Sequence, residues 1–96
     1  MVEIVNLDKV IISFISAEPY YTAEKLGYKN NTVREIDFTD DRFRKLAMMY
    51  ETGEYGKIEI QNTKFAVGND SFTRQIQHIA FWKNLAIITW KHEAIE

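Results

Sequence analysis

The run from Gly27 to Glu35, GYKNNTVRE, gathers a lysine, a threonine and an arginine close to a glycine. A lysine and an arginine can hold an anionic group, and a threonine hydroxyl can donate to the same ligand or accept from it. Strand alternation over 32–38 places Thr32 and Arg34 on the same face as two apolar residues. We therefore expect both polar side chains at the mouth of a curved sheet, in a ligand pocket formed by Gly27, Lys29, Thr32 and Arg34.

A structural role for the same residues remains open. Arg34 would then pair with an internal carboxylate such as Glu54 or Glu59, and Lys29 would be an exposed turn residue. In that case, replacing Arg34 would only lower stability.

A second polar group lies in the segment from Ser71 to His78, SFTRQIQH. Arginine and glutamine side chains can contact phosphates or base edges, and aromatic residues nearby can stack on bases. We expect Arg74 and Gln77 to assist the first group in binding a ligand. The alternative is a half-exposed strand with its polar residues directed outward.

Composition limits the classes of protein that this chain can represent. Its 96 residues fit one domain, 1–96, and a net charge of −2 argues against a broadly basic surface that coats nucleic acid. The absence of cysteine excludes disulfides, iron–sulfur clusters and thiol catalysis. With only two histidines, His78 and His92, and no metal-ligand spacing, we predict neither a metal nor any other cofactor.

Two helices are expected between the strands. Pro19 and Gly27 mark the ends of a short helix over 19–26. Thr39 and Asp40 are both candidates to cap a second helix, which Gly53 ends, within 39–53. Its expected buried stripe consists of Phe43, Leu46, Ala47 and Tyr50.

The strands account for most of the remaining chain. We expect them, in order, over 9–15, 32–38, 57–61, 64–67, 72–82 and 85–91. The first is apolar on both faces, which predicts burial on both. The last two form a hairpin joined by Lys83-Asn84, and imperfect alternation in 72–82 predicts a bulge. Together the elements predict an α+β fold, a small curled β-barrel of five to six strands with two short helices.

The pattern G-x-K-x-x-T-x-R at Gly27, Lys29, Thr32 and Arg34 resembles the signature of the ASCH domain family, which belongs to the PUA-like β-barrels. The order of elements is similar as well, from an apolar strand and a Pro-aromatic helix start to a C-terminal hairpin ending in LAIITW. The resemblance extends to phage and bacterial ASCH-like proteins of unknown function. It implies a pocket beside the G-x-K loop that binds RNA, nucleotides or modified nucleosides.

One enzymatic branch of that family resembles small amidohydrolases that remove an acyl group from N4-acetylcytidine. Carried over by motif position, Lys29 would be the nucleophile or base and Thr32 its polarising partner. The family's glutamate on a later strand has no clear counterpart here. Glu59 is the best candidate, but its parity with Ile58 and Ile60 directs it away from the core. We therefore expect binding rather than turnover.

Other classes find no support in the sequence. No G-x-S-x-G turn or phosphate-binding glycine loop occurs, and no apolar stretch has the length of a membrane span. The first residues do not resemble a secretory signal, so we expect a soluble cytoplasmic protein.

The end of the second helix, with Met48, Met49 and Tyr50, predicts an exposed apolar edge suited to a weak homodimer or a protein partner, if the chain is not a monomer. The resulting hypothesis is a module that binds a nucleotide or single-stranded nucleic acid, RNA in preference to DNA. The alternatives are an amidohydrolase and a protein-interaction module without a small ligand.

Overall fold

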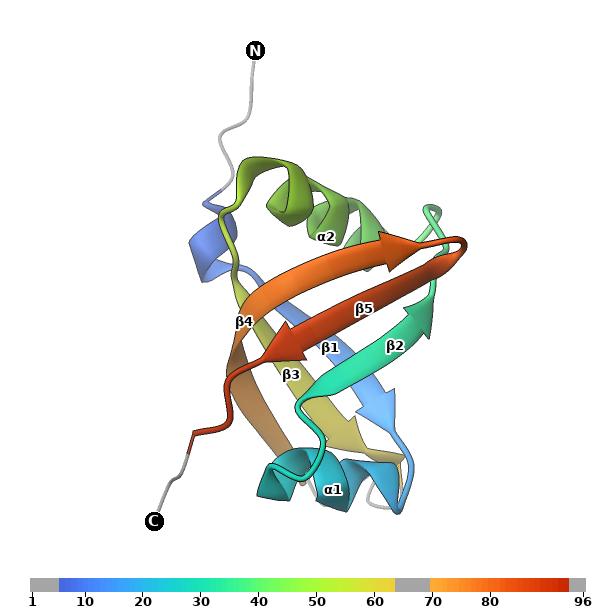
Figure 1. The fold of residues 1–96 in the computed structure, drawn as a ribbon, viewed down its shortest axis with the longest axis vertical. Helices are drawn as coiled ribbons and strands as arrows, with labels where there is room; N and C mark the ends of the chain where they lie inside the picture. Colours follow the sequence, from blue (N-terminus) through green and yellow to red (C-terminus); the bar gives the residue numbers. More distant parts are fainter. Residues whose placement is uncertain (1–5, 64–69, 94–96) are drawn as a thin grey trace.

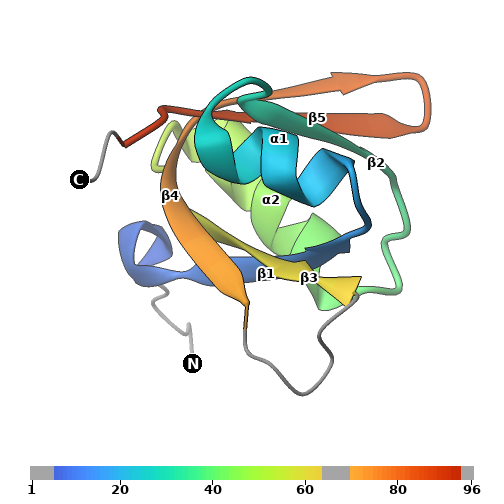
Figure 2. The same cartoon turned by 90° about the horizontal axis from the view of Figure 1, so that it is seen from below.

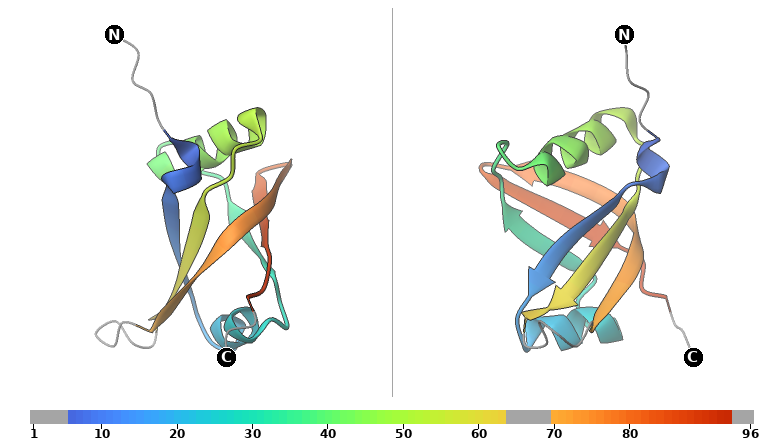
Figure 3. Two further views of the ribbon diagram at one scale, coloured as in Figure 1. Left: turned by 90° about the vertical axis from the view of Figure 1, so that its left-hand side faces the viewer. Right: turned by 180° about the vertical axis from the view of Figure 1, so that it is seen from behind.

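One five-stranded sheet, curled into a half-barrel, forms the frame of the protein (Figure 3). The computed structural model describes residues 6–63 and 70–93. In chain order the elements are η1 (Leu7–Lys9), β1 (Ile11–Ser16), α1 (Tyr20–Leu26), β2 (Asn31–Glu35), α2 (Asp41–Thr52), β3 (Lys57–Asn62), β4 (Ser71–Trp82) and β5 (Leu85–Trp90). This is a small α+β fold, as the sequence predicts. The strand expected over 64–67 lies outside the described residues.

The sheet has the order β1-β3-β4-β5-β2. β1 and β3 are parallel, and the other three pairs are antiparallel. The long strand β4 pairs with β3 through its first residues and with β5 through the rest. Its register shifts between Ile76 and His78, which leaves Gln77 as the extra residue of a bulge. The predicted bulge is thus confirmed, and it bends β4 so that one sheet forms both walls of the half-barrel.

The two helices lie at opposite ends of the half-barrel, α2 at the top and α1 at the bottom of Figure 1. In the view from below, α1 lies across the open end between the β1–β3 wall and the β5–β2 wall (Figure 2). Apolar residues from the sheet and both helices fill the space between them, including Ile12, Tyr21, Leu46, Ile58 and Trp90. The core therefore lies between the two helices and packs against α1 and both walls.

Local sequence signals account for the ends of α2 and α1. The Asp40 carboxylate accepts a hydrogen bond from the Arg42 backbone N–H at 3.0 Å, as an N-cap does. Gly53 and Gly27 follow α2 and α1 with φ angles of 77° and 89°, in the left-handed region that glycine adopts most readily. These three predicted boundary residues are confirmed.

Two predictions of burial are wrong. The sheet packs on the core through its inner face, so the outer face of β1 is open, as is that of β3, and Ile11 and Ile15 are 56% and 54% exposed. On α2, Met49 is buried in place of Tyr50, which lies with Met48 on the exposed side. Of the apolar edge expected at the end of this helix, Met48 and Tyr50 are exposed and Met49 is not.

β2 ends earlier than predicted, at Glu35 rather than Phe38. The Asp37 carboxylate accepts hydrogen bonds from the backbone N–H and hydroxyl of Thr39, which turns the chain toward α2. Phe38 is consequently exposed. In the part of the chain that is described, no helix is long and apolar enough to span a membrane.

Candidate functional site

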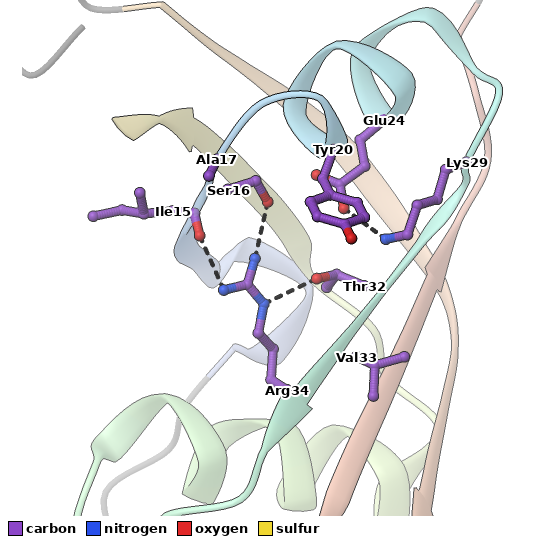
Figure 4. Close-up of a pocket in the computed structure, with 9 residues that line it drawn as sticks. All are labelled: Ile15, Ser16, Ala17, Tyr20, Glu24, Lys29, Thr32, Val33 and Arg34. Carbon is purple, nitrogen blue, oxygen red and sulfur yellow. Dashed lines mark hydrogen bonds and ion pairs between the residues drawn. The ribbon is translucent and has the colours of Figure 1, made fainter. Parts of the chain in front are cut away.

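A cavity of about 340 Å³ opens between the end of β1, the inner face of α1 and the start of β2 (Figure 4). It is lined by Ile15, Ser16, Ala17, Tyr20, Glu24, Lys29, Thr32, Val33 and Arg34. Three of the residues singled out from the sequence, Lys29, Thr32 and Arg34, therefore share one cavity. Gly27 is not a lining residue, but it ends α1 and so directs the following loop back along the helix.

Lys29 forms an ion pair with a buried carboxylate of α1. Its Nζ lies 2.8 Å from Oε2 of Glu24 and 2.6 Å from the backbone oxygen of Asn31. The Glu24 side chain is 1% exposed and that of Lys29 is 33% exposed. Oε1 of Glu24 is buried and, among the described residues, has no hydrogen-bond partner. Among residues 6–63 and 70–93, this buried carboxylate thus has one direct partner, the ammonium group of Lys29.

Arg34 reaches from β2 to the end of β1 (Figure 4). Its Nη1 donates to the backbone oxygen of Ile15 and its Nη2 to Oγ of Ser16, both at 3.0 Å. Its Nε donates to Oγ1 of Thr32 at 2.9 Å, and the guanidinium lies over the ring of Phe14, 4.8 Å from the centroid. β1 and β2 are the outer strands of the sheet, so this side chain joins the two edges of the half-barrel.

The partners of Arg34 differ from the internal carboxylate considered from the sequence. Burial lowers the pKa of Arg34, the positive charge of Arg42 lowers it further, and the carboxylate of Glu24 opposes both effects. Glu59 lies on the outer face, where Oε1 accepts from Ser13 Oγ at 2.8 Å and from Gln61. It is not among the residues that line the cavity of Lys29.

The cavity carries an excess of positive charge and of hydrogen-bond donors. Lys29 and Arg34 face a single carboxylate, that of Glu24, so one positive charge is left unbalanced. Within the described residues, Arg34 uses three of its five N–H groups and Lys29 two of its three. The free donors suit an anionic group.

Apolar and aromatic groups form the rest of the rim. Tyr20 is 60% exposed, and in Figure 4 its ring stands beside Lys29 and Thr32. Val33 and Ile15 are about half exposed on the same rim. The cavity therefore offers a ring for stacking next to cationic donors, which is the combination that nucleotide-binding sites use.

Arg74 and Gln77 do not join this cavity. Arg74 is buried on β4 and lines a different cavity, beyond the other side of α1. Gln77 is exposed at the bulge of β4. The group predicted to assist the ligand is therefore divided between separate places in the fold.

Sequence reasoning missed two residues of the cavity, Glu24 and Tyr20, as functional candidates. Glu24 follows the buried Tyr21 by three residues, which places it on the inner face of α1. An acid on the apolar face of a short helix, five residues before a lysine, was the signal available. Tyr20 directly precedes the buried Tyr21 in the sequence, and it lines the cavity.

Within residues 6–63 and 70–93 there is no group of three or more acidic or histidine side chains arranged to hold a metal ion. Comparisons with known proteins give no relative: no family model matches the chain, and no curated protein or solved structure reaches significant similarity. The function is therefore argued from the cavity itself.

Proposed function

We propose that this protein is an ASCH-like member of the PUA-like superfamily that binds a nucleotide or single-stranded nucleic acid, RNA in preference to DNA, in the cavity of Lys29. One observation carries the proposal: Lys29, Thr32 and Arg34 line the same cavity, with one unbalanced positive charge, beside the exposed ring of Tyr20. The half-barrel with a helix at each end and the G-x-K-x-x-T-x-R pattern support the family resemblance.

Each part of a nucleotide has a suitable partner in this arrangement. A phosphate would accept hydrogen bonds from the free N–H groups of Arg34 and Lys29. The base would stack on Tyr20, and Thr32 Oγ1 would contact a polar edge of the ligand. The net charge of −2 for the whole chain means that binding depends on this local site.

The test is a titration of the wild type with mononucleotides and with short single-stranded RNA and DNA, at two salt concentrations. Tyr20→Ala removes the stacking ring, and Tyr28→Ala is the matched control because Tyr28 is 84% exposed and does not line the cavity. Loss of one stacked base corresponds to about 1–3 kcal/mol, so Tyr20→Ala should weaken binding by a factor of about 5 to 150, whereas Tyr28→Ala should not.

Equal affinities of the two variants for the ligand would contradict the proposed site. If no nucleotide or single strand binds the wild type at millimolar concentration, the proposal fails. A protein-interaction module would then be the better explanation of the fold.

A second function, an amidohydrolase acting on N4-acylcytidine-type nucleosides, is favoured by the contact between Glu24 and Lys29. Such an enzyme needs a carboxylate within hydrogen-bond reach of the lysine amine, and Glu24 Oε2 is 2.8 Å away. In this scheme Glu24 supplies from α1 the glutamate that the resembling family takes from a later strand. Lys29 would first pass one ammonium proton to the Glu24 carboxylate, which leaves a neutral amine. This amine would take a proton from water while the water oxygen adds to the acyl carbon. Lys29 would then give that proton to the leaving nitrogen as the C–N bond breaks, and the products would be a carboxylic acid and the free nucleoside.

This second function is tested by incubating the protein with N4-acetylcytidine and measuring cytidine and acetate. The double variant Glu24→Gln/Lys29→Met should abolish release, because it removes the proposed acid–base pair without leaving one charge buried alone. Lys25→Met is the control, since Lys25 belongs to an exposed ion pair with Asp70. This mechanism would be excluded if the double variant still released cytidine and acetate, or if the wild type released neither. Both results would leave the binding proposal unaffected.

A further inference from the structure

Arg74 is a second buried arginine, and it lines a separate cavity. This cavity, of about 550 Å³, lies between the end of α1, the start of β4 and the residues after β5. Lys25 and Leu26 of α1 contribute to it, whereas Tyr20 and Glu24 of the same helix contribute to the cavity of Lys29. α1 thus forms a wall of both cavities.

The Arg74 guanidinium has no carboxylate partner among the described residues. The residue is 6% exposed, its Nη1 donates to the Thr73 backbone oxygen at 3.0 Å, and its Nη2 donates to that of Lys25 at 3.2 Å. The ring of Phe72 lies under it at 4.7 Å. Within the described part of the chain, Nε is buried without an acceptor. Two of the five N–H groups are therefore used by neutral oxygens, and residues 6–63 and 70–93 place no counter-ion on the buried charge.

The acids near this cavity are engaged elsewhere or lie at its rim. Asp70, just before β4, accepts from the Tyr21 hydroxyl at 3.0 Å and from Lys25 Nζ at 3.2 Å. Glu93 lines the cavity but is exposed. The Lys25 carbonyl, in the last turn of α1, supplies only the partial negative charge of a helix end.

A second polar atom at the cavity is also buried without a partner. His92 packs over Gly27, and its Nδ1 has no hydrogen-bond partner in the described part of the chain. His92 and Arg74 both line the cavity. In the tautomer that carries its proton on Nδ1, His92 would offer a second donor beside the Arg74 guanidinium to one oxygen-bearing group.

We propose that the cavity of Arg74 is a second ligand site, which binds an oxyanion group, a phosphate or a carboxylate, independently of the cavity of Lys29. The bound group supplies the acceptor that Arg74 Nε lacks and the negative charge that the buried guanidinium lacks. The Glu93 carboxylate at the rim opposes the ligand by repulsion, and so limits its affinity.

The test follows the side-chain Nε–H signal of Arg74 by NMR in the ¹⁵N-labelled full chain. Inorganic phosphate and acetate are titrated separately at constant ionic strength and neutral pH, and either anion is expected to give a saturable shift in the millimolar range. Which anion saturates first identifies the group. Absence of saturation with both anions up to about 50 mM would overturn the proposal.

Variants separate this site from general electrostatic attraction. Arg74→Lys keeps the charge but loses the planar fork, and is expected to weaken binding by roughly tenfold. Because this variant has no Arg74 Nε–H signal, the affinities of the variants are compared through the backbone amide signals of Ser71 and Thr73, which line the same cavity. Arg44→Gln, on the exposed side of α2, is the control and should have no effect. Glu93→Gln does not touch the Arg74 hydrogen bonds and should strengthen binding about two- to fivefold.

An equal effect of Arg44→Gln and Arg74→Lys on anion affinity would refute the specific site, as would unchanged affinity in Glu93→Gln. The double variant Glu24→Gln/Lys29→Met should keep the Arg74 response, because the two cavities share no side chain. Failure of nucleotide binding and failure of this second site are therefore distinguishable.

Discussion

The ion pair between Glu24 and Lys29 provides the sharpest test of the cavity's energetics. Lys29→Met would leave a carboxylate that is 1% exposed without its only direct partner. Breaking a fully buried pair in this way costs about 3–5 kcal/mol, and because a third of the Lys29 side chain is exposed we expect about 2–4 kcal/mol. The double variant Glu24→Gln/Lys29→Met removes both charges and should recover most of this loss.

The free energy of unfolding of the wild type, both single variants and the double variant would be measured with urea. Fluorescence of Trp90, a buried residue, reports the transition. A loss of about 3 kcal/mol moves the midpoint by about 2 M if m is about 1.5 kcal/mol/M. The expected coupling energy from the double-mutant cycle is at least about 1 kcal/mol.

Lys25→Met is the matched control for this cycle. Its ion pair with Asp70 is exposed, with side chains 46% and 34% accessible, so the expected loss is below about 1 kcal/mol. If Lys29→Met costs no more than Lys25→Met, or if the two cavity substitutions are additive, then Glu24 does not depend on Lys29 and the account of the cavity is wrong.

Three further outcomes follow from the same structure. Arg34→Met removes two hydrogen bonds from β2 to the end of β1 and one within β2, and should cost about 1–3 kcal/mol in urea unfolding; a loss below about 0.5 kcal/mol would mean that the link across the half-barrel is not formed. Gly27→Ala should destabilise more than Gly53→Ala by thermal unfolding, because both positions have positive φ but only at Gly27 would a Cβ meet the ring of His92, at 2.8 Å; equal losses would contradict this packing. Hydrogen bonds from the Arg42 side chain and backbone N–H hold the pKa of Asp40 below its usual range. The Asp40 carboxylate therefore contributes to stability above about pH 4, and this contribution is lost as the pH falls through the lower folded-state pKa. Asp40→Asn should reduce the fall in the free energy of unfolding between about pH 4 and lower pH, and an unchanged fall would refute the assignment.

Much of the frame was predictable because local signals determine it. Asp40, Gly27 and Gly53 set helix boundaries through capping and backbone conformation, which depend only on neighbouring residues. The hairpin joined by Lys83-Asn84 and the bulge at Gln77 also follow from short segments. Lys29 and Arg34 share a cavity. This could be expected because Gly27 ends the helix just before Lys29, and because alternation along the strand places Arg34 on the same face as Thr32.

What the sequence left undetermined depends on which face of the sheet packs on the core and on the rotation of a short helix. The outer face of β1, with Ile11 and Ile15, is exposed because the half-barrel packs through its inner face, as the same pattern in β3 shows, and no local pattern in an apolar strand encodes this. α1 spans seven residues, too few for periodicity to fix its buried side, so Glu24 was not assigned to the cavity. Arg74 was grouped with Arg34 because sequence patterns do not show that α1 lies between them.

The pairing of β2 with β5 ties the cavity to the order in which the chain is synthesised. Val33 pairs with Ile87, so β2 has no neighbouring strand until the residues of β5 have left the ribosome. Contacts between such distant segments close large loops and form late in folding. Until then Thr32 and Arg34 belong to an unpaired segment, even though α1 and Lys29 precede them in the chain. The cavity of Lys29 is therefore expected to be absent from nascent chains and to appear together with the finished domain.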